Sequence, residues 1–301
     1  FWYITYAKSG RKATTCRTYR DSYNAHIRKG IGKKKITKIT KEDCQKVFND
    51  MLYNNLSQYT LANLKSCLKV VFDSAVDEDI VLKNPICNIK LPHKGTKKRK
   101  IVKEKVLTEF FEYVKNKPVF SINYAALAFL FNTGCRIGEL CAITWSDVDF
   151  ECNTITIDKS LNRYRKEEYG FTLGIASTKS DSSNRTIKMN NFLREILLQH
   201  KLQGKKCISI IPFVNDSGKI IGEVSGFVFA NSRGKVWCEP SFLKMLNRIF
   251  NQYNDDKPNS EIYKFVPHEA RHTYTGMAYS AGADIKVVSF ALGHKSVTTT
   301  A

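Results

Sequence analysis

The sequence predicts an α+β protein with two domains, a helical N-terminal domain and a mixed α/β C-terminal domain. In residues 1–93, apolar residues recur at three- and four-residue steps, the spacing of one helix face. Residues 94–103 lose this rhythm and are rich in basic residues, as expected of an interdomain linker. Residues 104–301 combine helical spacing with short runs of β-prone residues, so helices and strands are both expected there.

The composition favours a polyanionic partner. The chain has 301 residues, with 48 Lys and Arg against 28 Asp and Glu, which gives a formal net charge of +20. A strongly basic chain attracts nucleic acid first and an acidic membrane surface second. No lipidation signal or amphipathic anchor supports the membrane alternative. Double-stranded DNA or another nucleic acid is therefore the preferred partner class.

Neither a membrane-spanning nor a secreted protein is expected. No apolar run is long enough to cross a bilayer, and the segment from Phe1 to Tyr6 lacks the features of a signal peptide. The chain begins without Met, which we interpret as the mark of a fragment. Its nine cysteines contain no C-x-x-C pair, so reduced cysteines and a cytoplasmic location are expected.

The N-terminal domain is predicted to be a small helical bundle with basic loops. Its first helix covers about 14–28. Thr40 is the expected N-cap of the second helix, although Asp43 stands where a capping box prefers Glu or Gln. That helix carries Val47, Phe48, Met51 and Leu52 on one side, and a third carries Leu61, Leu64, Leu68, Val71, Phe72 and Ala75.

Two basic segments supply the candidate DNA-binding residues. They are Lys33, Lys34 and Lys35 in the 31–40 loop, and Lys94, Lys97, Lys98, Arg99 and Lys100 in the linker. The linker could be a solvated connector or a localisation tract. Because both flanking domains are basic, we favour a strap across DNA phosphates.

The C-terminal domain is predicted to contain helices at about 104–117, 121–132, 190–202 and 240–252. Gly134 ends the second of these helices. A short helix follows, in which Ile137, Leu140 and Cys141 face the core, leaving Arg136 and Glu139 together on another side. Strand-like runs occur at 154–157, 174–177, 185–188 and 227–229. The middle two runs flank a polar turn and are predicted to form a hairpin.

Two helices are predicted near the C-terminal end. The first carries an apolar stripe of Ala270, Tyr274, Met277 and Ala281. Gly282 ends it, and Asp284 caps the next helix, which carries Ile285, Val287, Val288, Ala291 and Leu292.

The first of these helices opens with a motif that has two interpretations. The segment from His268 to His272 matches the H-E-x-x-H pattern of zinc proteases, with Glu269 as the base. It also places His268 and Arg271 three residues apart, where both can hold a phosphate. The zinc interpretation needs a third ligand, and the metzincin extension fails because position 278 is Ala. A distant third zinc ligand, such as His294 or Glu239, is the alternative that stays open. Arg271 between the ligands would also place a cation beside Zn²⁺.

Four motifs in order resemble the tyrosine recombinase family, the phage and transposon integrases. They are an arginine turn (Thr133 to Leu140, containing Arg136), a hairpin lysine (Lys179 in Ser177 to Ser180), an H-x-x-R helix (His268 and Arg271) and a Leu-Gly-His turn (Leu292 to His294). Residues 18–92 resemble the family's helical core-binding domain. Within the family, the sequence is similar to integrases of conjugative transposons and phages of Gram-positive bacteria.

The resemblance implies a C-shaped clamp on DNA and a transesterification that needs no metal, cofactor or ATP. Arg136 and Arg271 would bind the non-bridging phosphate oxygens through bidentate guanidinium groups. His268 and His294 would donate further hydrogen bonds, and Lys179 would protonate the leaving 5′ oxygen. Glu139 would orient Arg136, and His272 would have a supporting or structural role. Taken alone, Arg136 and Glu139 would favour a plain ion pair, Lys179 a solvated turn residue and His294 a helix cap, and the four motifs together outweigh these alternatives.

The family's nucleophilic tyrosine has no counterpart after His294, because the chain continues from Lys295 to Ala301 without one. We expect the tyrosine to follow Ala301, or to have been lost. The function implied is integration and excision of a mobile element through a 3′-phosphotyrosine. The implied partners are DNA recombination sites, a homo-tetramer on two sites and an accessory DNA-bending or excision factor, in the bacterial cytoplasm. A non-catalytic DNA-binding protein, a type IB topoisomerase and the metalloprotease are the alternatives.

Overall fold

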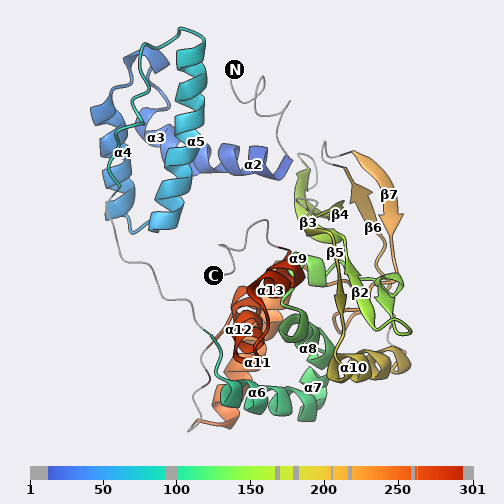
Figure 1. Ribbon diagram of the computed structural model, residues 1–301. Helices are drawn as coiled ribbons and strands as arrows, with labels where there is room; N and C mark the ends of the chain where they lie inside the picture. The colour runs from blue at the N-terminus through green and yellow to red at the C-terminus, as the bar shows by residue number, and fades with distance from the viewer. Residues whose placement is uncertain are drawn as a thin grey trace. The chain divides into compact units, whose positions relative to one another are not determined.

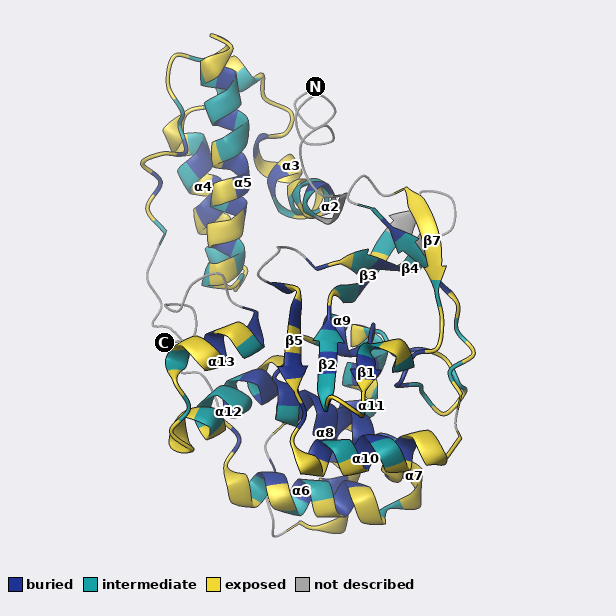
Figure 2. Ribbon diagram, turned by 45° about the vertical axis from the view of Figure 1, so that its right-hand side comes forward, coloured by how far each residue is buried: buried dark blue, intermediate teal, exposed yellow. Residues whose placement is uncertain are grey.

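The computed structural model describes residues 13–91, 101–166, 170–178, 183–204, 206–215, 219–258, 262 and 264–293. The chain divides into two compact units, Phe1–Lys97 and Lys98–Ala301. The division falls inside the 94–103 segment predicted to be the linker. Each unit has its own apolar core (Figure 2). No helix among the described residues has the length and apolar character needed to cross a membrane.

The N-terminal unit is helical, as the spacing predicts. Its elements are α2 (Ala13–Ser22), the π-helical turn η2 (Tyr23–Ile27), α3 (Arg28–Ile31), the 3₁₀ turn η3 (Ile36–Lys38), α4 (Lys41–Tyr53) and α5 (Gln58–Asp77). The predicted first helix is therefore three consecutive elements that end at Ile31. Thr40 caps α4: its Oγ1 accepts from the Asp43 N–H at 3.2 Å, and Asp43 Oδ2 accepts from the Thr40 N–H at 3.1 Å. The shorter Asp side chain completes the capping box after all.

The larger unit begins with helices, which gather at the lower end of the unit in Figure 1. These are α6 (Glu104–Asn116), α7 (Pro118–Ser121), α8 (Tyr124–Thr133) and the single turn α9 (Ile137–Leu140), followed later by α10 (Asn191–Leu202), α11 (Glu239–Asp256), α12 (Pro267–Ser280) and α13 (Ile285–Leu292). Helix α8 is buried on nearly every side, which accounts for its almost wholly apolar sequence. It packs against α12, α10, α9 and α6 and is the centre of this unit.

Two small sheets complete the larger unit. The first joins β1 (Val148–Asp149), which follows the 3₁₀ turn η4 (Trp145–Asp147), to β2 (Thr154–Ile157) and β5 (Arg185–Lys188), all antiparallel. The second has the order β3 (Lys159–Lys166), β4 (Gly170–Ser177), β6 (Ile211–Val214) and β7 (Ile220–Val224), with β4 and β6 parallel. Strand β5 lies against α13, so the first sheet meets the last helix of this unit.

The hairpin predicted between 174–177 and 185–188 is wrong. Residues 170–177 pair with β3 over eight positions, from Lys159 opposite Ser177 to Lys166 opposite Gly170. Residues 185–188 pair instead with β2, where Ile155 stands opposite Ile187. Strand β4 forms the longer ladder with β3, which immediately precedes it in the chain. Strand β5 therefore pairs with β2 in the other sheet.

Two further predictions in this unit need correction. The 227–229 run is not a strand, since Phe227 makes only an isolated bridge to Thr144 and is buried by side-chain packing. The apolar stripe predicted for α12 is incomplete: Ala270 is buried, but Met277 is 47% exposed and Ala281 is exposed. Helix α12 is buried only over its first half, where it crosses α8 and α13.

Candidate active site

The arginine turn between α8 and α9 is held by a left-handed glycine. Gly134 has φ +60°, which favours glycine, and it ends α8 as the sequence predicts. A Cβ added there would lie 2.7 Å from the Tyr274 ring and 2.8 Å from a methyl group of Leu292. These neighbours belong to α12 and α13, so the turn is pressed against both C-terminal helices. Arg136 follows in extended backbone as the N-cap of α9.

Glu139 is buried, contrary to the prediction that it shares an outward side with Arg136. Its side chain is 2% exposed, whereas that of Arg136 is 44% exposed. The Arg136 backbone N–H donates to Glu139 Oε2 at 2.9 Å, and Arg136 Nη1 donates to Oε1 at 2.8 Å. One carboxylate therefore closes the N-terminus of α9 and fixes the guanidinium above it. The prediction that Glu139 orients Arg136 agrees with these contacts.

Arg271 links the arginine turn to the end of α13. It is 2% exposed, and it donates from Nη1 to the Gly134 carbonyl at 3.0 Å and from Nη2 to the Leu292 carbonyl at 2.6 Å. Two motifs that are far apart in the sequence thus meet on one side chain. A guanidinium has five N–H donors, so two carbonyl bonds do not exhaust it.

His268 and His272 lie on the same helix, one turn apart. Their rings meet edge to face with centroids 4.6 Å apart, and His268 is exposed while His272 is half-buried. Glu269, the base of the zinc interpretation, is engaged elsewhere, because its Oε2 accepts from the Val266 N–H at 2.9 Å and caps α12. Within the described residues, no group of three potential metal ligands occurs. The role of Glu269 as the cap of α12 favours the phosphate interpretation of this helix.

The charges of the site are coupled. Burial, and then the nearby positive charge of Arg136, lowers the pKa of Arg271 from 12.5 to about 10. Burial alone would raise the pKa of Glu139, but hydrogen bonds from Arg185 and Arg136 hold it below its ordinary value. The site thus concentrates positive charge around a single carboxylate, which suits an anionic ligand.

Arg185 is a member of this cluster that the sequence interpretation missed. Its Nη2 donates to Glu139 Oε2 at 2.9 Å, and its side chain is fully buried. One signal was present in the sequence: in β5, Arg185 alternates in phase with the buried Ile187, which places an arginine on the inward face of the strand. Charged residues at such positions are buried only when they are paired.

Lys179 and His294 lie outside the described residues, as do the predicted DNA-binding residues Lys94, Lys97, Lys98, Arg99 and Lys100. Residues on either side of Lys179 and immediately before His294 are described. Thr178 hydrogen-bonds Asn184 across the connection that carries Lys179. Gly293, with φ +67°, ends α13 in the left-handed conformation immediately before His294.

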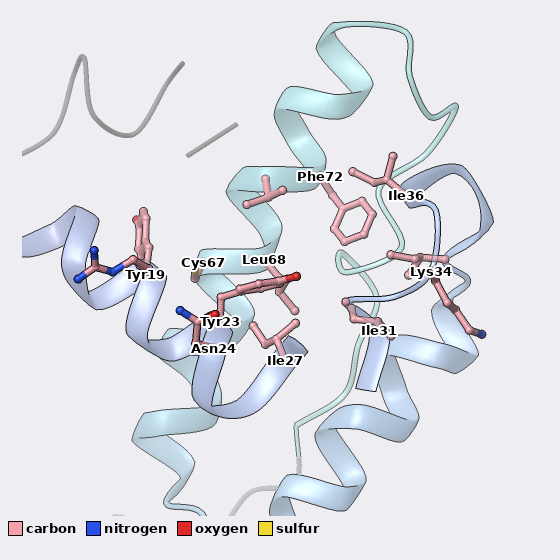
Figure 3. Close-up of a pocket in the computed structure, with 14 residues that line it drawn as sticks. Tyr19, Tyr23, Asn24, Ile27, Ile31, Lys34, Ile36, Cys67, Leu68 and Phe72 are labelled. Carbon is pink, nitrogen blue, oxygen red and sulfur yellow. The ribbon is translucent and has the colours of Figure 1, made fainter. Parts of the chain in front are cut away.

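The 31–40 loop exposes Lys33, Lys34 and Lys35. Lys34 forms an ion pair with Asp43, so part of its charge is compensated. Lys34 also borders a cavity of about 490 Å³ between α2, this loop and α5 (Figure 3). Tyrosine and aliphatic side chains line most of that cavity, and its charged lining residues are Arg20 and Lys34. The arginine cluster is therefore the stronger candidate for a reactive site.

Comparisons with known proteins identify the family of this chain. Residues 100–301 match the phage integrase family, and residues 2–52 match the N-terminal SAM-like domain of phage integrases. A tyrosine recombinase XerC-like protein of Caldanaerobacter subterraneus is 28% identical, covering 100% of this chain and 76% of the relative. The transposase of transposon Tn916 from Enterococcus faecalis is also 28% identical, over 97% of this chain and 73% of its own.

The fold has solved relatives as well. The integrase of transposon Tn1549, in complex with transposon right end DNA, superposes with a TM-score of 0.83 at 24% identity, covering 99% of this chain and 91% of that one. A λ integrase dimer bound to a core site gives a TM-score of 0.68 at 17% identity. Both likenesses concern the two-domain α+β architecture predicted from the sequence. Since the family match covers residues 100–301, more than half of the chain, this chain belongs to the phage integrase family, the tyrosine recombinases.

Proposed function

We propose that this family member is a site-specific recombinase that cuts and rejoins duplex DNA to integrate and excise a mobile element. The observation that carries the proposal is the arginine cluster: Arg136 and Arg271 are brought together by Gly134, Leu292 and Glu139 from separate motifs. Phosphoryl transfer at a DNA backbone builds negative charge on the two non-bridging oxygens. Fixed guanidinium groups stabilise that charge without needing to reorganise during the reaction.

In this mechanism Arg136 and Arg271 bind the scissile phosphate. Arg136 is 44% exposed and can meet the phosphate directly. Arg271 is buried, so we infer that the residues around it shift when the phosphate enters. His268, at the exposed start of α12, donates a hydrogen bond or moves a proton, and His272 supports its ring.

Lys179 and His294 complete the proposed site. A lysine in the connection after β4 is suited to protonating the 5′ oxygen as it leaves, and His294 follows the carbonyl that Arg271 binds. The nucleophile is a tyrosine that forms a 3′-phosphotyrosine bond, which conserves the bond energy for rejoining. A phenol has a reference pKa of about 10, and surrounding positive charge favours its ionised form.

The proposed partner is double-stranded DNA carrying recombination sites, held by a homo-tetramer in the bacterial cytoplasm with an accessory DNA-bending or excision factor. The 94–103 linker and the 31–40 loop are proposed to contact phosphates. We expect Lys33→Gln and Lys35→Gln each to lower the slope of log K against log salt by about 1, as for one lost phosphate contact. Lys34→Gln is expected to change the slope less, because Asp43 already pairs with that lysine. Equal slopes for all three variants and the wild type would remove this loop from the DNA contact surface.

The decisive experiment uses nicked duplex DNA that spans the ends of the element. A protein extended past Ala301 to include the expected tyrosine should become covalently attached to a 3′ phosphate, in the presence of EDTA. Arg136→Ala or Arg271→Ala should abolish attachment, while Arg194→Gln, at a half-buried arginine of α10 that pairs with Glu195, should leave it unchanged. Specific DNA binding without attachment would instead favour a non-catalytic DNA-binding protein of the same fold.

A further inference from the structure

Among the described charged residues of the site, Arg185 is enclosed most completely. Its side chain is 0% exposed, and three acceptors from three segments surround it. Nη2 donates to Glu139 Oε2 at 2.9 Å, Nε to the Ala291 carbonyl at 2.6 Å, and Nη1 to the Ser183 carbonyl at 3.0 Å. A buried guanidinium with this many fixed acceptors has one orientation, so the three segments have fixed positions relative to each other.

Each of these segments leads to a residue of the proposed reaction. Glu139 holds Arg136 by two hydrogen bonds. Ala291 lies in the last turn of α13, where its neighbour Leu292 accepts from Arg271, so consecutive carbonyls bind two different arginines. Ser183 lies in the connection between β4 and β5 that carries Lys179. Arg185 thus connects the residues that hold Arg136 and Arg271, although it belongs to neither of their motifs.

Arg185 also changes the charge balance. Glu139 is buried and has two arginine partners, Arg136 through Oε1 and Arg185 through Oε2. Without Arg185, the carboxylate would be the counter-ion of Arg136 alone and would cancel most of the charge that Arg136 can offer to a phosphate. With Arg185, the carboxylate orients Arg136 while Arg136, Arg185 and Arg271 together exceed it in charge. An ionised carboxylate in a buried site needs such compensation in any case.

We propose that Arg185 is a positioning residue of the strand-transfer reaction, which neutralises Glu139 and holds the arginine turn and the end of α13 in their reactive arrangement. This inference rests on the proposed function. It assigns Arg185 no contact with DNA. Its effect is therefore expected in the rate of the covalent step and not in the affinity for duplex DNA.

The test compares Arg185→Gln and Arg185→Lys with the wild type, each extended past Ala301, in covalent attachment to nicked DNA under single-turnover conditions. Arg185→Gln is expected to slow attachment about 10- to 100-fold, as for other groups that orient reacting residues, with duplex affinity changed less than about threefold. Arg185→Lys keeps the charge but cannot reach three acceptors, so an intermediate rate is expected. Arg194→Gln is the control, a half-buried arginine on α10 that forms an ion pair with Glu195.

The pair Arg185→Gln and Glu139→Gln tests the charge argument. Once the carboxylate is neutral it no longer needs a counter-ion, so the double variant should attach at least as fast as Arg185→Gln alone. If the double variant attached more slowly by the product of the two single-variant factors, the neutralising role would be overturned. A rate per folded molecule equal to the wild-type rate, with only a lowered melting temperature, would overturn the inference and leave the proposed function standing. Failure of the wild type itself to attach would instead contradict the proposed function, and the inference with it.

Discussion

The two units of this molecule fill their interiors in different ways. In the N-terminal unit, every described residue that is buried is hydrophobic, with Phe48, Leu61 and Leu64 at its centre. In the larger unit, Glu139, Arg185 and Arg271 are buried beside a core of the ordinary apolar kind. The charged groups lie where α8, α9, α12 and β5 meet.

This difference indicates what each interior does. An apolar core stabilises a fold through area removed from water, and many arrangements of similar volume serve equally well. Buried charges cost free energy unless they are paired, and their geometry is strict. A unit that retains them is stabilised less than it could be, and holds a preorganised positive site instead. We therefore expect mutations in the two interiors to separate stability from activity.

The largest effect is expected from Arg271→Gln, which should slow covalent attachment to nicked DNA about 10³-fold, or about 4 kcal/mol in activation free energy. Stability should fall little. The pKa of Arg271 is lowered to about 10, so the folded state binds this proton more weakly than the unfolded state. The charge thus opposes folding at neutral pH, and removing it offsets the two lost carbonyl bonds. Thermal unfolding measures the stability. A loss of unfolding free energy as large as the rise in activation free energy would contradict the comparison between the two units.

The opposite pattern is expected for Leu64→Ala in α5. Leu64 is 1% exposed, and truncating a buried leucine costs about 3 kcal/mol of unfolding free energy. Denaturant unfolding should show this loss, while the attachment rate of the folded molecules stays at the wild-type value. Leu82→Ala is the matched control, because Leu82 is 98% exposed. Similar losses for both leucines would mean that burial does not set the stability of this unit.

Anions should stabilise only the unit with buried positive charge. Sulfate resembles a phosphate group, and at ten times its dissociation constant a bound anion adds about 1.4 kcal/mol to the free energy of unfolding. Bound sulfate should also raise the pKa of Arg271 toward 12.5. Thermal unfolding in sulfate and in chloride of equal ionic strength measures the effect, which Arg136→Gln should reduce. If sulfate stabilised Arg136→Gln against unfolding as much as the wild type, the anion would bind elsewhere.

The smallest effect is expected from Thr40→Ala, which removes the cap of α4. Loss of an N-cap side chain costs about 1 kcal/mol, and the Asp43 N–H would lose its acceptor. The midpoint of denaturant unfolding should fall accordingly, with attachment of the folded molecules unchanged. Thr37→Ala, at an exposed position in the same loop, is the control. An equal shift in both variants would show that the capping box contributes nothing beyond the loop itself.

Local patterns were enough to predict much of this protein. The helices of the N-terminal unit, the Thr40 cap, the glycine that ends α8 and the two C-terminal helices depend on residues within one or two turns of each other. The order of the motifs likewise indicated the family and the arginines of the proposed site. Net charge indicated the class of partner before any contact was known.

Long-range contacts governed the rest. The 185–188 run joined β2 because β4 had a longer neighbour in β3, a competition that no local pattern reveals. Glu139 is buried, against expectation, because Arg185 approaches it from 46 positions away in the chain. A buried charge is stable only with its partner in place, and packing brings that partner. Periodicity therefore located the motif residues, whereas the compensating arginine became visible only in the folded chain.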